Sequence, residues 1–151
     1  MKLEPVRHSY YTQIEWTNGK KGILSSNDKP NIKVACPPEF GGHADIWSPE
    51  DLFVGSTEVC LLTTFLWLID REKVSLISYK SHARGILELG NKKPRFTTII
   101  VNIKICIKSG KDVEKIEKVF KKIKESCLIS NSINTEVIIE HEIEVKENIK
   151  S

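Results

Sequence analysis

The four cysteines, at positions 36, 60, 106 and 127, are the residues of this chain best suited to chemistry. No Cys-x-x-Cys pair occurs, and no two cysteines are closer than 21 residues. Structural zinc sites usually contain such closely spaced pairs. The spacing therefore argues against zinc and leaves thiol chemistry, in which a thiolate attacks an oxidant or another sulfur.

Cys60 lies in the longest uncharged apolar stretch, residues 59–69. A thiol in such surroundings is commonly an inert small hydrophobe, because burial raises its pKa. Position 60 is also three turns beyond the predicted helix start, too far for the helix dipole to stabilise a thiolate. A reactive Cys60 therefore needs a cation or hydrogen-bond donors from another segment, and the inert alternative stays open.

Cys127 lies at the end of a predicted helix over residues 111–127. The apolar residues of this segment, at 113, 116, 120 and 123, form one stripe that Cys127 continues. Two core-facing cysteines on different helices can meet where the helices pack. A meeting pair could cycle between dithiol and disulfide, one thiolate attacking an oxidant and the other thiol resolving the sulfenic acid. Spacing alone does not show that they meet, so an inert Cys127 is also an open alternative.

Other candidate residues have simpler interpretations. Glu50 suits the first turn of a helix, and a functional role for it requires a basic partner. Cys36 precedes two prolines in a loop and Cys106 falls on the polar face of a strand, so both are interpreted as incidental. The four histidines, at 8, 43, 82 and 141, lack metal-ligand spacing. We expect neither a metal nor a cofactor.

The elements that position these residues follow from periodicity and turn signals. Strands are predicted over residues 8–17, 21–25, 31–35, 74–89, 96–108 and 137–145, with a tight turn at Asn18-Gly19. A helix is predicted from Pro49, capped by Ser48, to Glu72, and residues 130–132 are predicted as a turn. This order predicts a single α+β domain over residues 1–151 with mostly antiparallel sheets and a long buried central helix.

Composition excludes several classes of protein. The chain is 40% hydrophobic and 28% charged, which is atypical of disorder, and its net charge of +3 is too small to indicate a nucleic-acid partner. The apolar run over residues 59–69 spans about 16 Å as a helix, roughly half a bilayer core. We therefore expect no membrane partner and a cytoplasmic protein with reduced cysteines. Since the helix has no polar face there, it must lie centrally or be covered by a partner subunit.

Two motifs carry a resemblance to a known family. The sequence SPEDLFVGSTEVC, residues 48–60, resembles the PEEL...C segment of the OsmC/Ohr family, named for osmotic induction and organic hydroperoxide resistance. The sequence CLISNSI, residues 127–133, resembles the family's C-x-x-S-x-x-[LI] element at a helix end. Residues 40–42 and 47–49 resemble a less characterised OsmC-like branch. The ten-residue step from Glu50 to Cys60 and the strand-helix order fit as well.

The resemblance implies a thiol-dependent peroxidase in oxidative stress defence, an intertwined homodimer with its active sites at the subunit interface. In it, Cys60 attacks an organic hydroperoxide, Cys127 resolves the sulfenic acid as a disulfide, and a dithiol reductant restores both thiols. Glu50 orients the cation that stabilises the thiolate. That cation is an arginine in family peroxidases, and Lys20 stands at its place in Gly19-Lys20-Lys21-Gly22. Apolar neighbours favour alkyl peroxides over hydrogen peroxide.

Two other functions are compatible with the same scaffold. A non-catalytic binding protein would use the apolar interface cleft for an acyl or thiol-bearing ligand. The absence of arginine between Arg7 and Arg71 favours this alternative, whereas the retention of both cysteines disfavours it. A thiol redox sensor would signal to a partner, but no DNA-binding motif or basic patch supports a transcriptional role.

Overall fold

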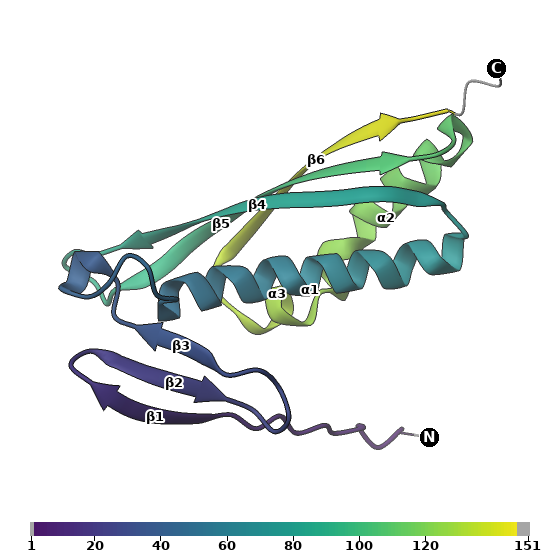
Figure 1. The fold of residues 1–151 in the computed structure, drawn as a ribbon. Helices are drawn as coiled ribbons and strands as arrows, with labels where there is room; N and C mark the ends of the chain where they lie inside the picture. Colours follow the sequence, from purple (N-terminus) through teal and green to yellow (C-terminus); the bar gives the residue numbers. More distant parts are fainter. Residues whose placement is uncertain (1, 148–151) are drawn as a thin grey trace. The chain divides into compact units, whose positions relative to one another are not determined.

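The computed structural model describes residues 2–147, which fall into two compact units, the first ending at Leu52 and the second beginning at Phe53 (Figure 1). The chain order is β1 (Gln13–Asn18), β2 (Lys21–Ser25), β3 (Ile32–Ala35), a 3-10 helix (Pro38–Phe40), α1 (Pro49–Glu72), β4 (Leu76–Glu88), β5 (Arg95–Ile107), a 3-10 helix (Gly110–Asp112), α2 (Val113–Ser126), α3 (Leu128–Ser132) and β6 (Glu136–Val145). This is the predicted α+β class. The single domain over residues 1–151 stays a prediction.

The first unit contains an antiparallel meander, β1-β2-β3. Its first turn is the predicted one: Asn18 pairs with Lys21, and Gly19 adopts a φ of 50°, which glycine tolerates without a Cβ penalty. The first strand begins at Gln13 and not at residue 8. Gln13 pairs with Ser25, where β2 ends, so the preceding residues have no neighbouring strand to pair with.

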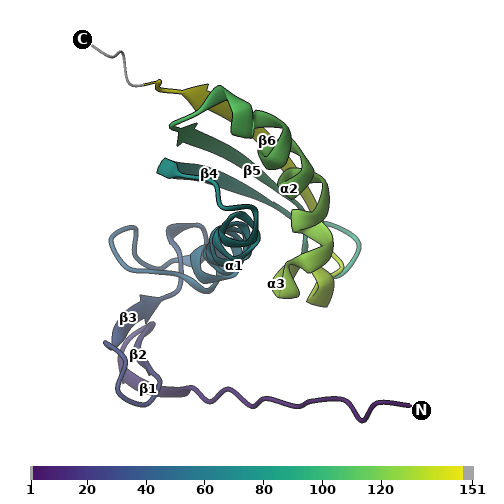
Figure 2. The same ribbon diagram turned by 90° about the vertical axis from the view of Figure 1, so that its right-hand side faces the viewer.

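The second unit is a three-stranded sheet, β4-β5-β6, with β4 and β5 antiparallel and β5 and β6 parallel. The helix α2 provides the crossover that parallel strands require. Both α1 and α2 pack on the same face of this sheet (Figure 2). Pairing in the described chain is therefore mostly antiparallel, as predicted.

The core of the second unit lies between its helices and its sheet. Leu61 and Phe65 of α1 are fully buried, and the Phe65 ring lies 5.5 Å from the Phe120 ring of α2. Burying side chains of this size contributes roughly 1.5–3 kcal/mol each. Most of the remaining buried core is a row of β5 residues and the inner stripe of α2: Ile99, Val101, Ile103, Ile105, Ile107, Ile116 and Ile123.

The start of α1 confirms the predicted cap. The Asp51 backbone N–H donates to Ser48 Oγ at 3.1 Å, and the Ser48 N–H donates to Asp51 Oδ2 at 3.0 Å. These reciprocal bonds satisfy two donors that a helix N-terminus leaves free. The observed bounds, Pro49–Glu72, match the prediction.

Three local predictions differ from the structure. Regular alternation over the predicted strand 74–89 would place Ile77 on the same face as the half-buried Tyr79, but Ile77 is 45% exposed, because a register irregularity between Leu76 and Ser78 shifts the alternation. Cys106 is buried and not on a wet face: β5 is the central strand, and a small side chain between two neighbours is easily covered. Residues 130–132 belong to α3, whose first turn closes when the Asn131 N–H donates to the Cys127 carbonyl at 3.1 Å.

Tyr79 of β4 has a buried hydroxyl with no hydrogen-bond partner among residues 2–147. Burial, and secondly the charge of Glu58, raise the pKa of Tyr79 to about 12. An unfolded tyrosine titrates near pH 10. The stabilisation from keeping this phenol neutral is therefore complete below pH 10 and lost as pH rises toward 12.

Replacing Tyr79 by phenylalanine should remove the fall in stability that ionisation of Tyr79 causes at alkaline pH. It should cost little stability at pH 7, because the hydroxyl has no hydrogen-bond partner to lose. Urea unfolding at pH 7 and pH 11 measures this. Tyr10→Phe is the control, since Tyr10 is 90% exposed. Equal alkaline losses for wild type and Tyr79→Phe would contradict the assignment.

Candidate functional site

Cys60 lies in the middle of α1 and is half-buried against the core of the second unit. The Thr64 hydroxyl, one helical turn further on, is 4.0 Å from the Cys60 sulfur. Residues four apart lie on the same helix face, so this contact follows from the helix itself. A hydroxyl in this position can donate a hydrogen bond to a thiolate.

Cys127 occupies the joint between α2 and α3 and is 0% exposed. Its N–H donates to the Ile123 carbonyl at 3.0 Å, and its carbonyl accepts from Asn131. It therefore ends one helix and begins the next, as the predicted stripe required. Both Cys60 and Cys127 are free thiols in this structure.

The two cysteines lie near enough to one another that each shifts the pKa of the other. Burial by itself raises the pKa of Cys60, but hydrogen bonds outweigh it and the net pKa lies below the ordinary thiol value. The bonds come from the backbone of Ile129 and Leu128 and from the side chains of Cys127 and Thr64. The thiolate of Cys60 thus forms more readily than that of an ordinary thiol. Part of its surroundings comes from α3, which lies beside α1 in both views (Figures 1 and 2).

The pKa of Cys127 is shifted in the opposite direction. Burial raises it most, and the neighbouring Cys60 raises it further, while the side chain and backbone of Ser130 lower it in part. Near neutral pH, Cys60 is therefore the better nucleophile and Cys127 keeps its proton. Such an asymmetric pair can perform attack followed by resolution.

The other two predicted site residues belong to the first unit. Glu50, in the first turn of α1, has one carboxylate oxygen, Oε2, that is buried without a hydrogen-bond partner among the described residues. Lys20 follows the β1–β2 turn, and its Nζ donates to the Phe40 carbonyl at 2.7 Å. Roles for Glu50 and Lys20 at the Cys60 thiolate stay predictions.

Sequence reasoning missed the hydroxyl and amide donors of this site. Thr64 could have been found from the sequence, because it lies four residues after Cys60 in the predicted helix and therefore on the same helix face. The amides of Leu128 and Ile129 gave no sequence signal, because contact between α1 and α3 depends on tertiary packing. Ser130 was noted in the second motif but assigned to a turn and given no role.

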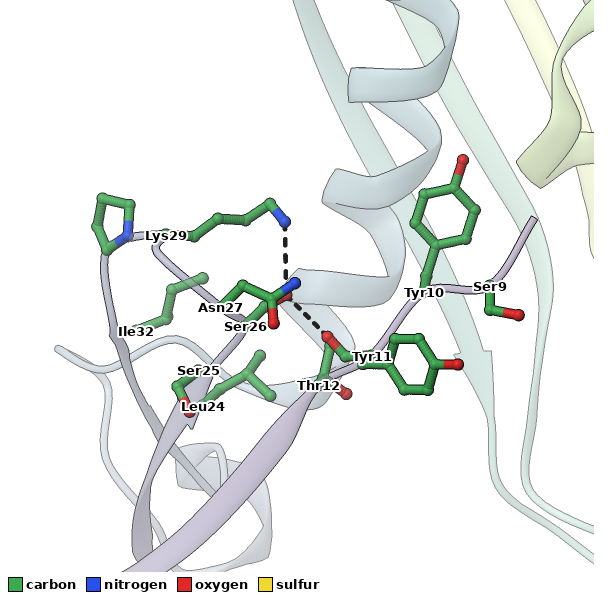
Figure 3. Close-up of a pocket in the computed structure, with 11 residues that line it drawn as sticks. Ser9, Tyr10, Tyr11, Thr12, Leu24, Ser25, Ser26, Asn27, Lys29 and Ile32 are labelled. Atoms are coloured by element: carbon green, nitrogen blue, oxygen red, sulfur yellow. Dashed lines mark hydrogen bonds between the residues drawn. The ribbon is translucent and has the colours of Figure 1, made fainter.

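A separate cavity of about 350 Å³ lies in the first unit (Figure 3). Tyr10, Tyr11, Leu24 and Ile32 contribute apolar surface, and the Ser26 hydroxyl donates to the Tyr11 carbonyl at 2.7 Å. The lining contains no cysteine, histidine or carboxylate. Within residues 2–147, no group of three His, Cys, Asp or Glu side chains is arranged to hold a metal.

Comparison with known proteins places this fold and site in a family. The sequence pattern of the OsmC-like protein family matches residues 42–142, more than half of the chain, including α1, both site cysteines and most of the second unit. The chain belongs to the OsmC-like family. The resemblance to this family that the two motifs predicted is thereby confirmed.

Individual relatives are distant in sequence but similar in fold. The uncharacterized protein YmaD of Bacillus subtilis is 23% identical over 144 residues, covering 92% of this chain and 95% of YmaD. An OsmC-like protein of unknown function from Vibrio cholerae has a TM-score of 0.82 at 19% identity, covering 90% and 100% of the two chains. An organic hydroperoxide resistance protein OsmC from Legionella pneumophila has a TM-score of 0.70 at 20% identity, covering 93% and 100%.

Proposed function

We propose that this protein is a thiol-dependent peroxidase that reduces organic hydroperoxides to alcohols. The observation that carries the proposal is the Cys60–Cys127 pair, two free thiols that influence one another and have pKa values shifted in opposite directions. The organic hydroperoxide resistance protein among its structural neighbours supports the same chemistry.

The proposed reaction has three balanced steps. The Cys60 thiolate attacks the terminal peroxide oxygen, the O–O bond breaks, and the alkoxide takes up a proton to leave as an alcohol. The Cys60 sulfenic acid then reacts with the Cys127 thiol, forming the disulfide and releasing water. A dithiol reductant finally restores both thiols by exchange, and is itself oxidised to a disulfide.

Glu50 and Lys20 supply the proposed electrostatic support. The buried, unpartnered oxygen of Glu50 is suited to holding a cation, because a buried charge without a partner is costly. In the proposed site that cation is Lys20. A lysine can stabilise a thiolate but lacks the planar fork with which arginine binds two groups at once.

We further propose that the active unit is a homodimer. By length and composition, α1 is the one helix among residues 2–147 that could cross a membrane, a property it shares with core helices of soluble proteins. Only 22% of its most apolar window is buried within the chain. A second subunit would cover the apolar part of α1 that its own chain leaves exposed. A cytoplasmic location agrees with this arrangement and is part of the proposal.

The function is tested by peroxide consumption in the presence of dithiothreitol. We expect the wild-type protein to consume cumene hydroperoxide faster than hydrogen peroxide, since each buried CH₂ of the substrate contributes about 0.8 kcal/mol. Dithiothreitol without protein gives the background. Consumption no faster than this background would refute the peroxidase and favour the alternative, binding of an acyl or thiol-bearing ligand.

A further inference from the structure

The Ser130 hydroxyl is a buried polar group that the proposed reaction has not yet used. Its Oγ atom is buried and has no hydrogen-bond partner among residues 2–147. It lies three residues after Cys127 in the first turn of α3, a spacing that places both residues on the same side of the turn, and its side chain lowers the pKa of the Cys127 thiol. A buried hydroxyl beside a reacting sulfur needs an explanation.

Reduction of the Cys60–Cys127 disulfide requires one of its two sulfurs to leave as a thiolate, and a nearby hydroxyl could stabilise that thiolate. In thiol–disulfide exchange, the attacked sulfur keeps the incoming group and the other leaves as a thiolate. Cys127 is 0% exposed whereas Cys60 is half-buried, so an incoming thiolate reaches Cys60. Cys127 must then leave, although burial raises its pKa and makes it a poor leaving group.

We propose that Ser130 is a catalytic residue of the reductive half-reaction, donating a hydrogen bond to the Cys127 sulfur as it leaves. The proposal rests on the proposed function. The thiolate of a dithiol attacks the Cys60 sulfur, forming a mixed disulfide and breaking the bond to Cys127. The Ser130 hydroxyl stabilises the departing Cys127 thiolate, which then takes up a proton. The second thiol of the reductant displaces the Cys60 thiolate and completes the reductant's own disulfide.

The oxidative half-reaction has separate donors. The Cys60 sulfur faces Thr64 and the amides of α3, so its attack on peroxide does not depend on the Ser130 side chain. The turn itself is held by other bonds. Ser132 Oγ donates to the Leu128 carbonyl at 2.7 Å, and Asn131 Nδ2 donates to the Glu125 carbonyl at 2.8 Å. Removing the Ser130 hydroxyl should therefore leave the turn in place.

The test separates the two half-reactions. Diamide converts the protein to the Cys60–Cys127 disulfide without any peroxide, mass spectrometry confirms the bond, and stopped-flow records its reduction by dithiothreitol. We expect Ser130→Ala to slow this reduction about tenfold, the order expected for one lost hydrogen bond to a developing charge. Ser130→Thr should restore it. The rate of Cys60 oxidation by cumene hydroperoxide should be unchanged in both variants.

Ser132→Ala is the matched control, since it removes a hydroxyl from the same turn on its exposed side. Equal reduction rates for wild type and Ser130→Ala would overturn the proposal. Equal slowing by Ser132→Ala would also overturn it, because it would indicate that the hydroxyls only hold the turn. Failure of diamide to produce the Cys60–Cys127 disulfide would overturn it as well. If Ser130→Ala slows disulfide reduction but the wild-type protein does not turn over peroxide, the role of Ser130 stands and only the proposed peroxidase function is refuted.

Discussion

Replacing Cys60 by serine is expected to reduce turnover of cumene hydroperoxide to the background of free dithiothreitol, a loss of at least about a hundredfold. A serine hydroxyl is far less nucleophilic than a thiolate, and the donors around position 60 cannot ionise it. In the wild type, the lowered pKa of Cys60 should keep the first step fast to lower pH than for an ordinary thiol. Rates of cumene hydroperoxide loss from pH 5 to pH 9 measure both effects.

Cys127→Ser is the informative companion to this variant. Without reductant, it should consume one equivalent of peroxide and accumulate a sulfenic acid that dimedone traps, whereas the wild type should form a disulfide. Cys36→Ser is the control, because the Cys36 thiol belongs to the first unit and bonds to the Phe40 carbonyl at 3.5 Å. Full turnover by Cys60→Ser, or disulfide formation by Cys127→Ser, would rule out the assigned roles.

Introducing a charge on the exposed side of α1 is expected to dissociate the proposed homodimer. The buried row of this helix, Thr57, Leu61, Phe65 and Ile69, faces the core of its own unit. Val59, Leu66 and Trp67 lie on other sides of the helix and are 62%, 42% and 51% exposed. Burying a glutamate there without a partner would cost more than an apolar contact provides.

Light scattering after gel filtration in detergent-free buffer measures this effect. The wild type should have twice the chain mass of 17.2 kDa, and Leu66→Glu should elute at the single-chain mass. Leu89→Glu is the matched control, because Leu89 is 59% exposed but follows β4 and not α1. A wild-type protein of single-chain mass, or a Leu66→Glu variant that stays at twice that mass, would contradict the proposed interface.

Local signals in the sequence were sufficient for most of the fold. The Ser48 cap and Pro49 determined the start of α1, and the stripe ending at Cys127 placed that thiol on the buried side of its helix. These signals lie within a few residues of one another, where propensity and periodicity act directly. The exposed Ile77 shows the limit: alternation predicts the face of a strand only while the register is regular.

The site was less predictable than the fold because its parts come from separate segments. Sequence spacing left open whether Cys60 and Cys127 lie near one another, since their influence on each other depends on packing between separate helices. The amides that favour the Cys60 thiolate belong to a short helix that the sequence presented as a turn. Helix-length periodicity cannot detect a helix of five residues, and backbone donors have no side-chain signature.

The separation of the two cysteines along the chain has a thermodynamic consequence. A bond between them encloses 67 residues, the difference between positions 60 and 127. Closing a loop of that length restricts the unfolded chain and stabilises the folded one by about 4 kcal/mol in the chain-entropy view. Oxidation would thus make this protein harder to unfold during the interval in which it is chemically spent, and reduction would return that stability together with its reactivity.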